Sequence, residues 1–348
     1  MDTANFHLLN GFQRDFPLTS EPFRVIAEQL GQSESEVLAA LRRWQDEGKI
    51  SRVGAVFATR KLGVSTLAAL AVPPERLETV AAWVNGYPEV NHNYQREYAF
   101  NLWFVLTAAS STRLQTILAD IRHKTGLPLL DLPLLEAFHI DLGFDLRHGG
   151  RQRPRTEPKT EPTSAPVTLS EPDRELLAAL QPGLPLVSRP YQALAHSLGW
   201  REQAVIARLR DWLEQGVIKR LGVIVRHREL GYRANAMVVW DIPDTEVSAA
   251  GRALAGEAGV NLCYRRPRRL PDWPYNLFCM MHGRERDEVL ARIEGLGARH
   301  RLATYPHAAL FSTRCFRQRG AWYLPAVTAS EQRENRQVAP GEAVAWTN

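Results

Sequence analysis

The sequence lacks the features of a membrane-spanning or secreted protein. No apolar run approaches the roughly 18 to 20 residues that a membrane-spanning helix requires. The first residues, MDTANFHLLNGFQRDFPL, contain an early Asp2 and no cleavable apolar stretch, so we expect no signal peptide. The chain has 3 cysteines (Cys263, Cys279 and Cys315), none in the C-x-x-C spacing of a disulfide framework or zinc site. We therefore expect a cytoplasmic protein with reduced thiols.

Several catalytic signatures are also missing. No pair of carboxylates, no Ser/His/Asp set, no metal-ligand cluster and no Gly-rich phosphate loop stands out. The charge is basic instead, with 43 Lys and Arg against 38 Asp and Glu and a pI of about 9.2. Arginine is concentrated in CYRRPRRLP (263–271). This balance favours an anionic partner, either nucleic acid or a polyacidic small molecule.

The chain of 348 residues contains an internal repeat. Segment 30–63 aligns with 198–231, matching Trp44 to Trp212 and Arg52 to Arg220. Further on, VNHNYQR (90–96) aligns with VNLCYRR (260–266), and NLWFVL (101–106) with NLFCMM (276–281). The repeat is too long for a solenoid unit, so it predicts two copies of one two-part module.

Each copy begins with the pattern of a winged helix-turn-helix. In the first copy, a short amphipathic segment ends at Gly31, and Ser33 with Glu36 predicts a capping box for a helix over 34–47. The alternating segment 49–63 predicts a hairpin. The second copy repeats this pattern over 190–227.

The rest of each copy alternates strands and helices. The first copy predicts strands near 65–72, 90–96, 100–108 and 135–146, with helices over 74–86 and 112–126. This β-α-β-β-α-β order is typical of a ferredoxin-like unit, and the second copy repeats it from about 232 to 318. The predicted fold class is thus α+β, a tandem repeat of a winged helix-turn-helix and a ferredoxin-like unit.

The resulting domains have predicted boundaries. Segments 148–168 and 326–348 are poor in apolar residues and predict a flexible linker and a disordered tail. The helix-turn-helix units are placed at 1–60 and 169–228, and the ferredoxin-like units at 61–147 and 229–325.

The helix-turn-helix units have two interpretations. A DNA reader needs polar side chains early in its recognition helix, here 34–47 or 201–215. The first helix begins with Glu34, Ser35 and Glu36, and carboxylates are unfavourable beside phosphates. The second helix offers Arg201 and Arg208, although Glu202 intervenes. The other interpretation is a unit kept for packing or dimerisation.

The two central strands of each ferredoxin-like unit contain the candidate site. Because alternate residues share one face of a strand, His92, Tyr94 and Arg96 are predicted to lie together. Histidine exchanges protons near neutral pH and arginine clamps carboxylates, which suits a flat, polycarboxylated ligand. The recurring cluster is Tyr94, Arg96, Asn101, Trp103 and Phe104 in the first copy, and Tyr264, Arg266, Tyr275, Asn276 and Phe278 in the second.

Each of these residues also fits an ordinary sheet, with the aromatics in the core and the arginines in solvent. The recurrence of the cluster in both copies is what favours a site. Arg265, Arg268 and Arg269 fit a rim or loop, and His282 ends a strand that faces the same region. The remaining histidines considered, His123, His139, His300 and His307, are interpreted as structural.

The combination of units resembles the AsnC/Lrp family of bacterial regulators. The motifs HNYQRE…NLWFV and CYRRPRRLPDWPYNLF resemble a narrower group of AsnC/Lrp-like enzymes, the siroheme decarboxylases, in a form with two subunit types fused. The resemblance implies a carboxy-lyase that converts siroheme to 12,18-didecarboxysiroheme by removing two acetate carboxylates. The product would serve heme d1 or an alternative heme pathway. It implies no separate cofactor, because the iron tetrapyrrole is the substrate, and it implies assembly with similar subunits.

The resemblance also implies roles for the candidate residues. His92 would donate a proton or orient the substrate, Arg96 would clamp a carboxylate, and His282 would be a second acid or contact the iron side. The expected substrate-binding residues are Tyr94, Tyr98, Asn101, Trp103, Tyr264, Arg265, Arg266, Tyr275 and Asn276.

The sequence departs from the pattern of the group at two positions. Tyr98 stands where members often have a second histidine, and Leu262 stands at the position that matches His92. The copies are therefore not equivalent, and we expect one competent pocket centred on His92. The alternative function is an AsnC/Lrp-type transcription regulator that senses a small ligand or heme.

Overall fold

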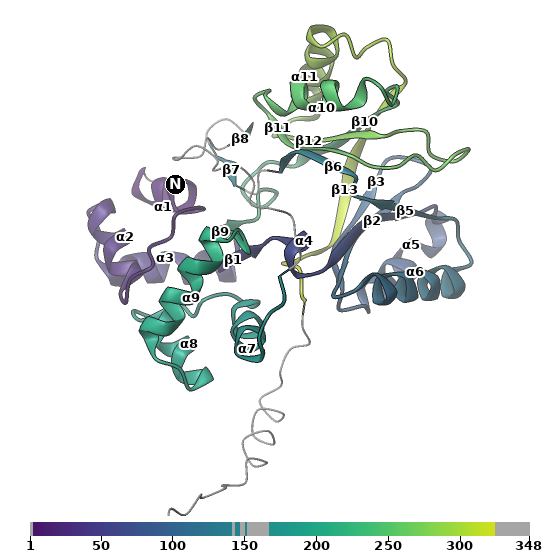
Figure 1. The fold of residues 1–348 in the computed structure, drawn as a ribbon. Helices are drawn as coiled ribbons and strands as arrows, with labels where there is room; N and C mark the ends of the chain where they lie inside the picture. Colours follow the sequence, from purple (N-terminus) through teal and green to yellow (C-terminus); the bar gives the residue numbers. More distant parts are fainter. Residues whose placement is uncertain (1–2, 141–142, 147–149, 152–166, 324–348) are drawn as a thin grey trace, which may run out of the picture.

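The computed structural model describes residues 3–140, 143–146, 150–151 and 167–323. The predicted tail and nearly all of the predicted linker lie outside these residues. Within the described part of the chain, no helix is both long and apolar enough to cross a membrane. The α+β tandem repeat predicted from the sequence is confirmed (Figure 1).

The two helix-turn-helix units have the same element order. Ser33 caps α3 and forms the predicted capping box with Glu36, and Trp44 and Trp212 are buried at matching positions of the common core. The first unit comprises α1 (Thr3–Gly11), α2 (Pro22–Leu30), α3 (Glu34–Asp46) and β1 (Ile50–Phe57), and the second comprises α7 (Glu171–Leu180), α8 (Pro190–Leu198), α9 (Glu202–Glu214) and β9 (Ile218–Val225).

The hairpin predicted in each copy is wrong. The first copy has a single strand, β1, followed by the short helix α4 (Thr59–Leu62), and β1 pairs with β9 of the other copy. Each strand alone would leave a row of backbone groups unpaired, and the matching strand of the other copy satisfies them. The two units therefore share one antiparallel β1–β9 ribbon.

A pair of glycines lies opposite each other at the centre of this ribbon. Gly54 faces Gly222, and loop segments of the two units cross directly over them. The Val223 N–H donates to the carbonyl of Phe12 at 2.8 Å on one side. A Cβ atom on Gly222 would lie 2.4 Å from the backbone of Gln13, so the segments can cross this closely only because glycine has no side chain.

The two ferredoxin-like units form one nine-stranded sheet with the order β5-β2-β4-β3-β13-β10-β12-β11-β6. The first unit supplies β2 (Val64–Leu70), α5 (Leu77–Asn85), β3 (Val90–Arg96), β4 (Leu102–Ala108), α6 (Ser111–Thr125), β5 (Leu129–Pro133) and β6 (Glu136–Ile140). The second supplies β10 (Ala234–Trp240), α10 (Val247–Ala255), β11 (Val260–Arg265), β12 (Leu277–Gly283), α11 (Arg286–Arg299) and β13 (His307–Gln318).

The last strands of the two units hold the copies together. The first half of β13 pairs with β10 of its own unit, and the second half pairs with β3 of the other. In the same way, β5 pairs with β2, and β6 continues the chain to pair with β11. The fourth strand of the first unit is thus β5 at 129–133, and the prediction of that strand near 135–146 is wrong, because β6 in that segment belongs to the edge of the other unit.

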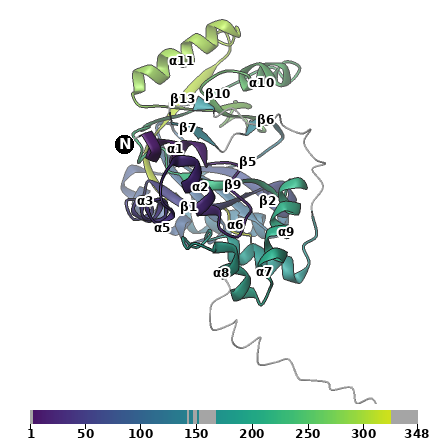
Figure 2. The same cartoon turned by 90° about the vertical axis from the view of Figure 1, so that its left-hand side faces the viewer.

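The helices pack against one face of the sheet and form two apolar cores with it, one in each ferredoxin-like unit. A third apolar core lies on the opposite face. Figure 1 shows α10 and α11 over one half of the sheet and α5 and α6 against the other. The third core joins residues of both units, including Trp103, Trp273 and Phe278. In the view of Figure 2, α10 and α11 lie at the end of the molecule away from the helix-turn-helix units.

The tight crossing at Gly222 generates a prediction about stability. Gly222→Ala is expected to reduce the free energy of unfolding by about 1–3 kcal/mol, because the added methyl group collides with backbone atoms that cannot rotate away. Gly295→Ala, on α11 with no atom within 4 Å of the new Cβ, is the control and is expected to be neutral or slightly stabilising. Urea unfolding followed by circular dichroism measures both, and equal stability of the two variants would contradict this account.

Candidate active site

Strand β3 presents the first group of candidate residues on its inner face. Alternation places His92, Tyr94 and Arg96 together, while the Asn93 amide turns to the other side and donates to the carbonyl of Ala81 at 3.3 Å. The rings of His92 and Tyr94 stack at 6.3 Å, and the Arg96 guanidinium lies over the Tyr94 ring at 5.8 Å. The shared face predicted from the sequence is therefore present.

Arg96 connects this group to the second copy. Its guanidinium donates to the Leu310 carbonyl at 2.9 Å and to Asn235 Oδ1 at 3.3 Å. Asn235 Nδ2 in turn donates to His282 Nε2 at 2.9 Å, and His282 Nδ1 donates to Asn261 Oδ1 at 2.8 Å. Because each amide has a defined direction, the chain of bonds fixes His282 as the neutral tautomer with its proton on Nδ1.

Three imidazoles meet at this junction between the copies. The rings of His227 and His282 lie 4.3 Å apart, edge to face, on the second copy. His92 of the first copy lies close enough to His227 for its charge to affect the His227 pKa. His92 Nδ1 is 2.9 Å from Asn91 Oδ1, which it reaches as a donor, and Nε2 has no hydrogen-bond partner among the described residues. Asn235 Nδ2 lies 3.4 Å from His227 Nε2 and 2.9 Å from His282 Nε2, so of the three rings His92 is the one whose Nε2 is available to a ligand.

The electrostatic environment keeps all three imidazoles neutral at pH 7. Burial lowers the pKa of His92 to about 4, and the charge of Arg52 adds to the effect. Burial lowers the pKa of His227 to about 4 as well, with further contributions from His92 and Arg228. The pKa of His282 also lies well below its usual value, through burial and then the neighbouring His227 and Arg96.

The arginines around the imidazoles have no carboxylate partners. Within the described residues, no Asp or Glu forms an ion pair with Arg52, Arg96, Arg226 or Arg228. Burial alone lowers the pKa of Arg96 to about 10, which measures how unfavourable this charge is without a counterion. A site of this kind is suited to a ligand that brings several negative charges.

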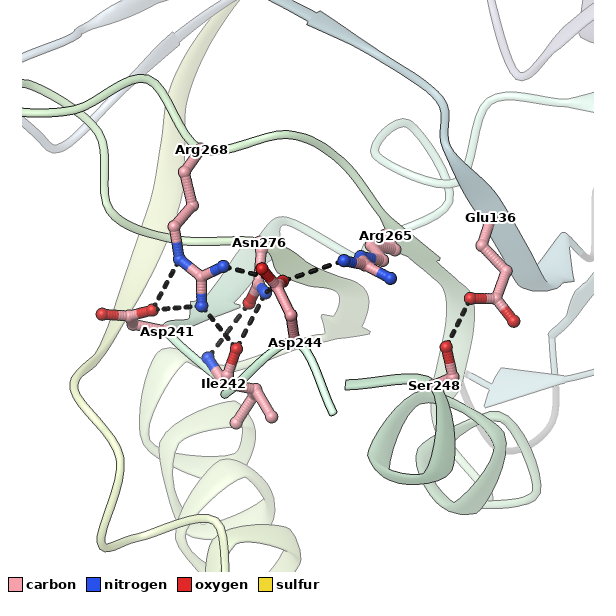
Figure 3. A network of polar contacts seen from close by, with 8 residues as sticks. All are labelled: Glu136, Asp241, Ile242, Asp244, Ser248, Arg265, Arg268 and Asn276. Atoms are coloured by element: carbon pink, nitrogen blue, oxygen red, sulfur yellow. Dashed lines mark hydrogen bonds and ion pairs between the residues drawn. The ribbon is translucent and has the colours of Figure 1, made fainter. Parts of the chain in front are cut away.

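The arginine loop of the second copy is different (Figure 3). Arg265 forms an ion pair with Asp244 at 2.8 Å, and Arg268 pairs with Asp241 at 2.7 Å and with Asp244 at 2.9 Å. The Asn276 amide is bound to the Ile242 backbone, accepting from its N–H at 3.0 Å and donating to its carbonyl at 2.8 Å. In the structure both side chains hold the loop, and the expectation that Arg265 and Asn276 bind substrate stays a prediction.

Asn101 and Trp103 have the corresponding structural roles in the first copy. The Asn101 amide binds the N–H and the carbonyl of Val72 at 2.9 and 2.8 Å, as Asn276 binds Ile242. Trp103 is 1% exposed, donates to the Phe100 carbonyl and packs against Trp273 at 5.1 Å. That these two bind substrate stays a prediction. The structure adds that alternation gave the face of Trp103 but not its depth in the core.

The remaining predicted residues fall into two places. Arg266 lies over Tyr264 at 4.6 Å and donates to the Leu132 carbonyl, which repeats the arrangement of Arg96 and Leu310. Tyr264 also lies close enough to Arg96 for its charge to affect the Arg96 pKa, so these residues border the same interior. Tyr98 and Tyr275 lie at the strand ends away from the imidazoles, with their hydroxyls 3.4 Å apart.

Sequence reasoning missed His227, Asn235 and Asn261. The repeat itself concealed His227, because the first copy has Thr59 at the matching position. The one available signal was Asn261, which matches Asn91 in both VN motifs.

At the matching corner of the molecule, other residue types replace the three imidazoles. Leu262, Thr107 and Thr59 occupy the positions of His92, His282 and His227, and the Asn91 amide donates to Thr107 at 2.9 Å as a counterpart of the Asn261–His282 bond. Only one composite group of imidazoles therefore exists per chain in the described residues.

These features define a class of protein before any finer assignment. The ferredoxin-like units at 61–139 and 229–317 match the family model for the AsnC-like ligand binding domain. The helix-turn-helix units at 7–50 and 173–219 match the model for the siroheme decarboxylase NirDL-like HTH domain.

The chain belongs to the siroheme decarboxylase family. It is 48% identical over 328 residues to the siroheme decarboxylase NirDL subunit of Paracoccus denitrificans, covering 92% of this chain and 97% of that one. It is 54% identical over 151 residues to the siroheme decarboxylase NirL subunit of Stutzerimonas stutzeri, covering 43% of this chain and 89% of that subunit. A crystal structure of siroheme decarboxylase NirDL in complex with an iron-uroporphyrin III analogue has a TM-score of 0.66 and 28% identity, covering 96% of this chain and 97% of that one.

The low pKa values of the buried imidazoles generate a prediction. Histidine in the unfolded chain titrates near about 6.5, so between pH 6.5 and about 4 the unfolded state binds protons that the folded state does not. Stability is therefore expected to fall as the pH drops through this window. His282→Gln, which keeps a hydrogen-bonding side chain but cannot titrate, is expected to make the loss shallower. Urea unfolding from pH 4 to 7 measures the slope, and identical slopes for both proteins would contradict the assignment.

Proposed function

We propose that the imidazole group of His92, His227 and His282, with the surrounding arginines, is the site at which this chain decarboxylates siroheme to 12,18-didecarboxysiroheme. The protein is a carboxy-lyase of the siroheme decarboxylase family, in the fused form, and serves heme d1 biosynthesis. The observation that carries the assignment of the site is a group of arginines, around imidazoles from both copies, for which the described part of the chain supplies no carboxylate partner. A substrate with eight carboxylates supplies the missing counterions.

Each reaction exchanges one carbon dioxide for one proton. Breaking the bond between an acetate carboxylate and its methylene leaves the electron pair on that carbon, and a proton converts it to a methyl group. Arg96 and Tyr94 would hold the macrocycle beside His92, whose Nε2 has no hydrogen-bond partner among the described residues. His92 takes up a second proton, on Nε2, when the carboxylates of the substrate bind, and the resulting imidazolium gives that proton to the carbon. A histidine positioned in this way contributes about 10²–10⁴-fold as a general acid.

His282 has a different role in this scheme. Both of its nitrogens are engaged, Nε2 by Asn235 and Nδ1 by Asn261, so it cannot donate from Nε2 until Asn235 turns away. We propose that His282 orients the Asn235 amide, which in turn holds the Arg96 guanidinium in place. His92 is thus the proton donor and His282 a positioning residue.

The alternative function, a DNA-binding regulator, is opposed by contacts between the helix-turn-helix units. Glu34, at the start of α3, accepts a hydrogen bond from Ser188 at 2.9 Å, and Glu202, at the start of α9, accepts one from Ser20 at 3.1 Å. Each recognition helix therefore turns the end that would read bases toward the other unit. A gel shift at stated salt tests the alternative directly.

The remaining assignments are expectations. We propose that the reaction needs no separate cofactor, that the protein acts in the cytoplasm, and that it associates with copies of itself or with related subunits.

The assignment of His92 is tested by activity. His92→Ala is expected to lower the rate of carbon dioxide loss by about 10²-fold or more, because neither His227 nor His282 has an Nε2 atom without a hydrogen-bond partner that could replace it. His282→Gln is expected to retain part of the activity, and His123→Gln, at an exposed position on α6, is the control. Anaerobic incubation with siroheme, followed by chromatography and mass analysis, measures the products. Full activity of the His92 variant would remove it as the proton donor.

A second prediction concerns proton uptake. Bound carboxylates bring negative charge to the imidazoles, which raises their pKa from about 4 and leads them to take up protons at pH 7. Calorimetric titration with ferric uroporphyrin in buffers of different ionisation enthalpy measures the number of protons. Uptake is expected in the wild type and reduced uptake in His92→Gln. Binding without proton exchange would contradict the coupling.

A further inference from the structure

Arg52 has an unusual environment that the scheme above does not use. It lies on β1, in the first helix-turn-helix unit, and donates only to the Ala55 carbonyl at 3.1 Å and the Ser51 hydroxyl at 3.4 Å. Its Nε is buried without a partner, and no carboxylate among the described residues lies within ion-pair distance. Burial lowers its pKa to about 10. The guanidinium is thus a partly buried charge without a counterion.

A short series of backbone contacts connects Arg52 to the residue next to His92. The Arg319 N–H, just after β13, donates to the carbonyl of Asn91 at 2.9 Å. A Cβ on the next residue, Gly320, would lie 2.5 Å from Arg52 Nη2, so the guanidinium occupies the space that a side chain at Gly320 would fill. His92 follows Asn91 in the chain, and its pKa is lowered by the Arg52 charge. These contacts place the free cation at the edge of the imidazole group.

We propose that Arg52 binds an acetate carboxylate of the tetrapyrrole substrate next to His92, and that the helix-turn-helix unit is therefore part of the substrate site. This inference rests on the proposed function. An acetate held by Arg52 lies beside the proton donor, and its negative charge offsets the Arg52 cation, which adds to the effect of burial in keeping His92 neutral. Binding of the carboxylate and protonation of His92 then favour one another.

The matching arginine of the second copy, Arg220, differs from Arg52 in its surroundings. Arg220 is 6% exposed, and its guanidinium donates to the carbonyl of Gln13 at 2.6 Å. At its corner of the molecule Leu262 replaces His92. The repeat therefore retains an arginine in both ribbon strands, but only Arg52 lies next to an imidazole.

The experiment compares two iron porphyrins as probes. Uroporphyrin carries acetates and propionates, whereas coproporphyrin carries propionates and methyl groups in place of the acetates. In the full-length chain, Arg52→Met is expected to weaken ferric uroporphyrin binding about tenfold and ferric coproporphyrin binding less than about threefold. Arg24→Met, at an exposed arginine on α2, is the control that removes one positive charge without touching the site. Absorbance titration measures both affinities, and circular dichroism reports folding.

Arg52→Lys is the second variant, for the case in which the methionine variant does not fold. It keeps the charge but not the two-pronged hydrogen bonding, so its uroporphyrin affinity is expected to lie between those of wild type and Arg52→Met. A further readout is the pKa of His92 from NMR titration without ligand, which is expected to rise in Arg52→Met because a neighbouring cation is lost.

Three outcomes would overturn the inference: unchanged uroporphyrin affinity in the folded Arg52 variant, an equal loss for both porphyrins, or an unchanged His92 pKa. Failure of the proposed function has a separate signature. In that case the wild-type chain leaves siroheme intact without oxygen, whatever the Arg52 variants do to porphyrin binding.

Discussion

Strand pairing between the two copies is the constraint on which the rest of the structure depends. The ribbon β1–β9 joins the helix-turn-helix units, and the pairs β13–β3 and β6–β11 join the ferredoxin-like units. Each of these strands would be an exposed edge in an isolated copy. Because these edge strands pair with each other, the copies are held in one register of strand pairing. That register brings His92 of one copy toward His282 of the other.

The site combines two conditions that are unfavourable in a protein without ligand. Arg52 and Arg96 have positive charges that no described carboxylate neutralises, and the imidazoles beside them have pKa values too low for protonation at pH 7. In the function that we propose, the binding of a polycarboxylate relieves both conditions. The arginine loop at Arg268, neutralised by Asp241 and Asp244, shows the arrangement that the chain uses where an arginine only stabilises the fold. The two regions therefore differ in whether a described carboxylate neutralises the arginine, a difference that composition alone does not reveal.

Much of the fold could be predicted from the sequence because the signals were local or repeated. The capping box of Ser33 and Glu36 and the alternation of His92, Tyr94 and Arg96 depend on neighbours within one element.

The errors arose where the deciding contact was distant. The segment after α3 looked like a hairpin because its true partner, β9, lies in the other copy. Depth in the core was equally inaccessible, since alternation cannot distinguish Trp103, buried against Trp273, from a side chain at the edge of a pocket. His227 and Asn235 were missed because their relation to His282 exists only after the strands pair.

The division of the imidazoles between the copies has a consequence for how the halves can be combined. Two first copies assembled with each other would place His92 opposite Thr107 and Thr59, and two second copies would place Leu262 opposite His282 and His227. Neither like-with-like assembly contains the complete set. Joining the halves in one polypeptide makes the complementary partner always present at high local concentration, so a covalent tether excludes the two unproductive assemblies.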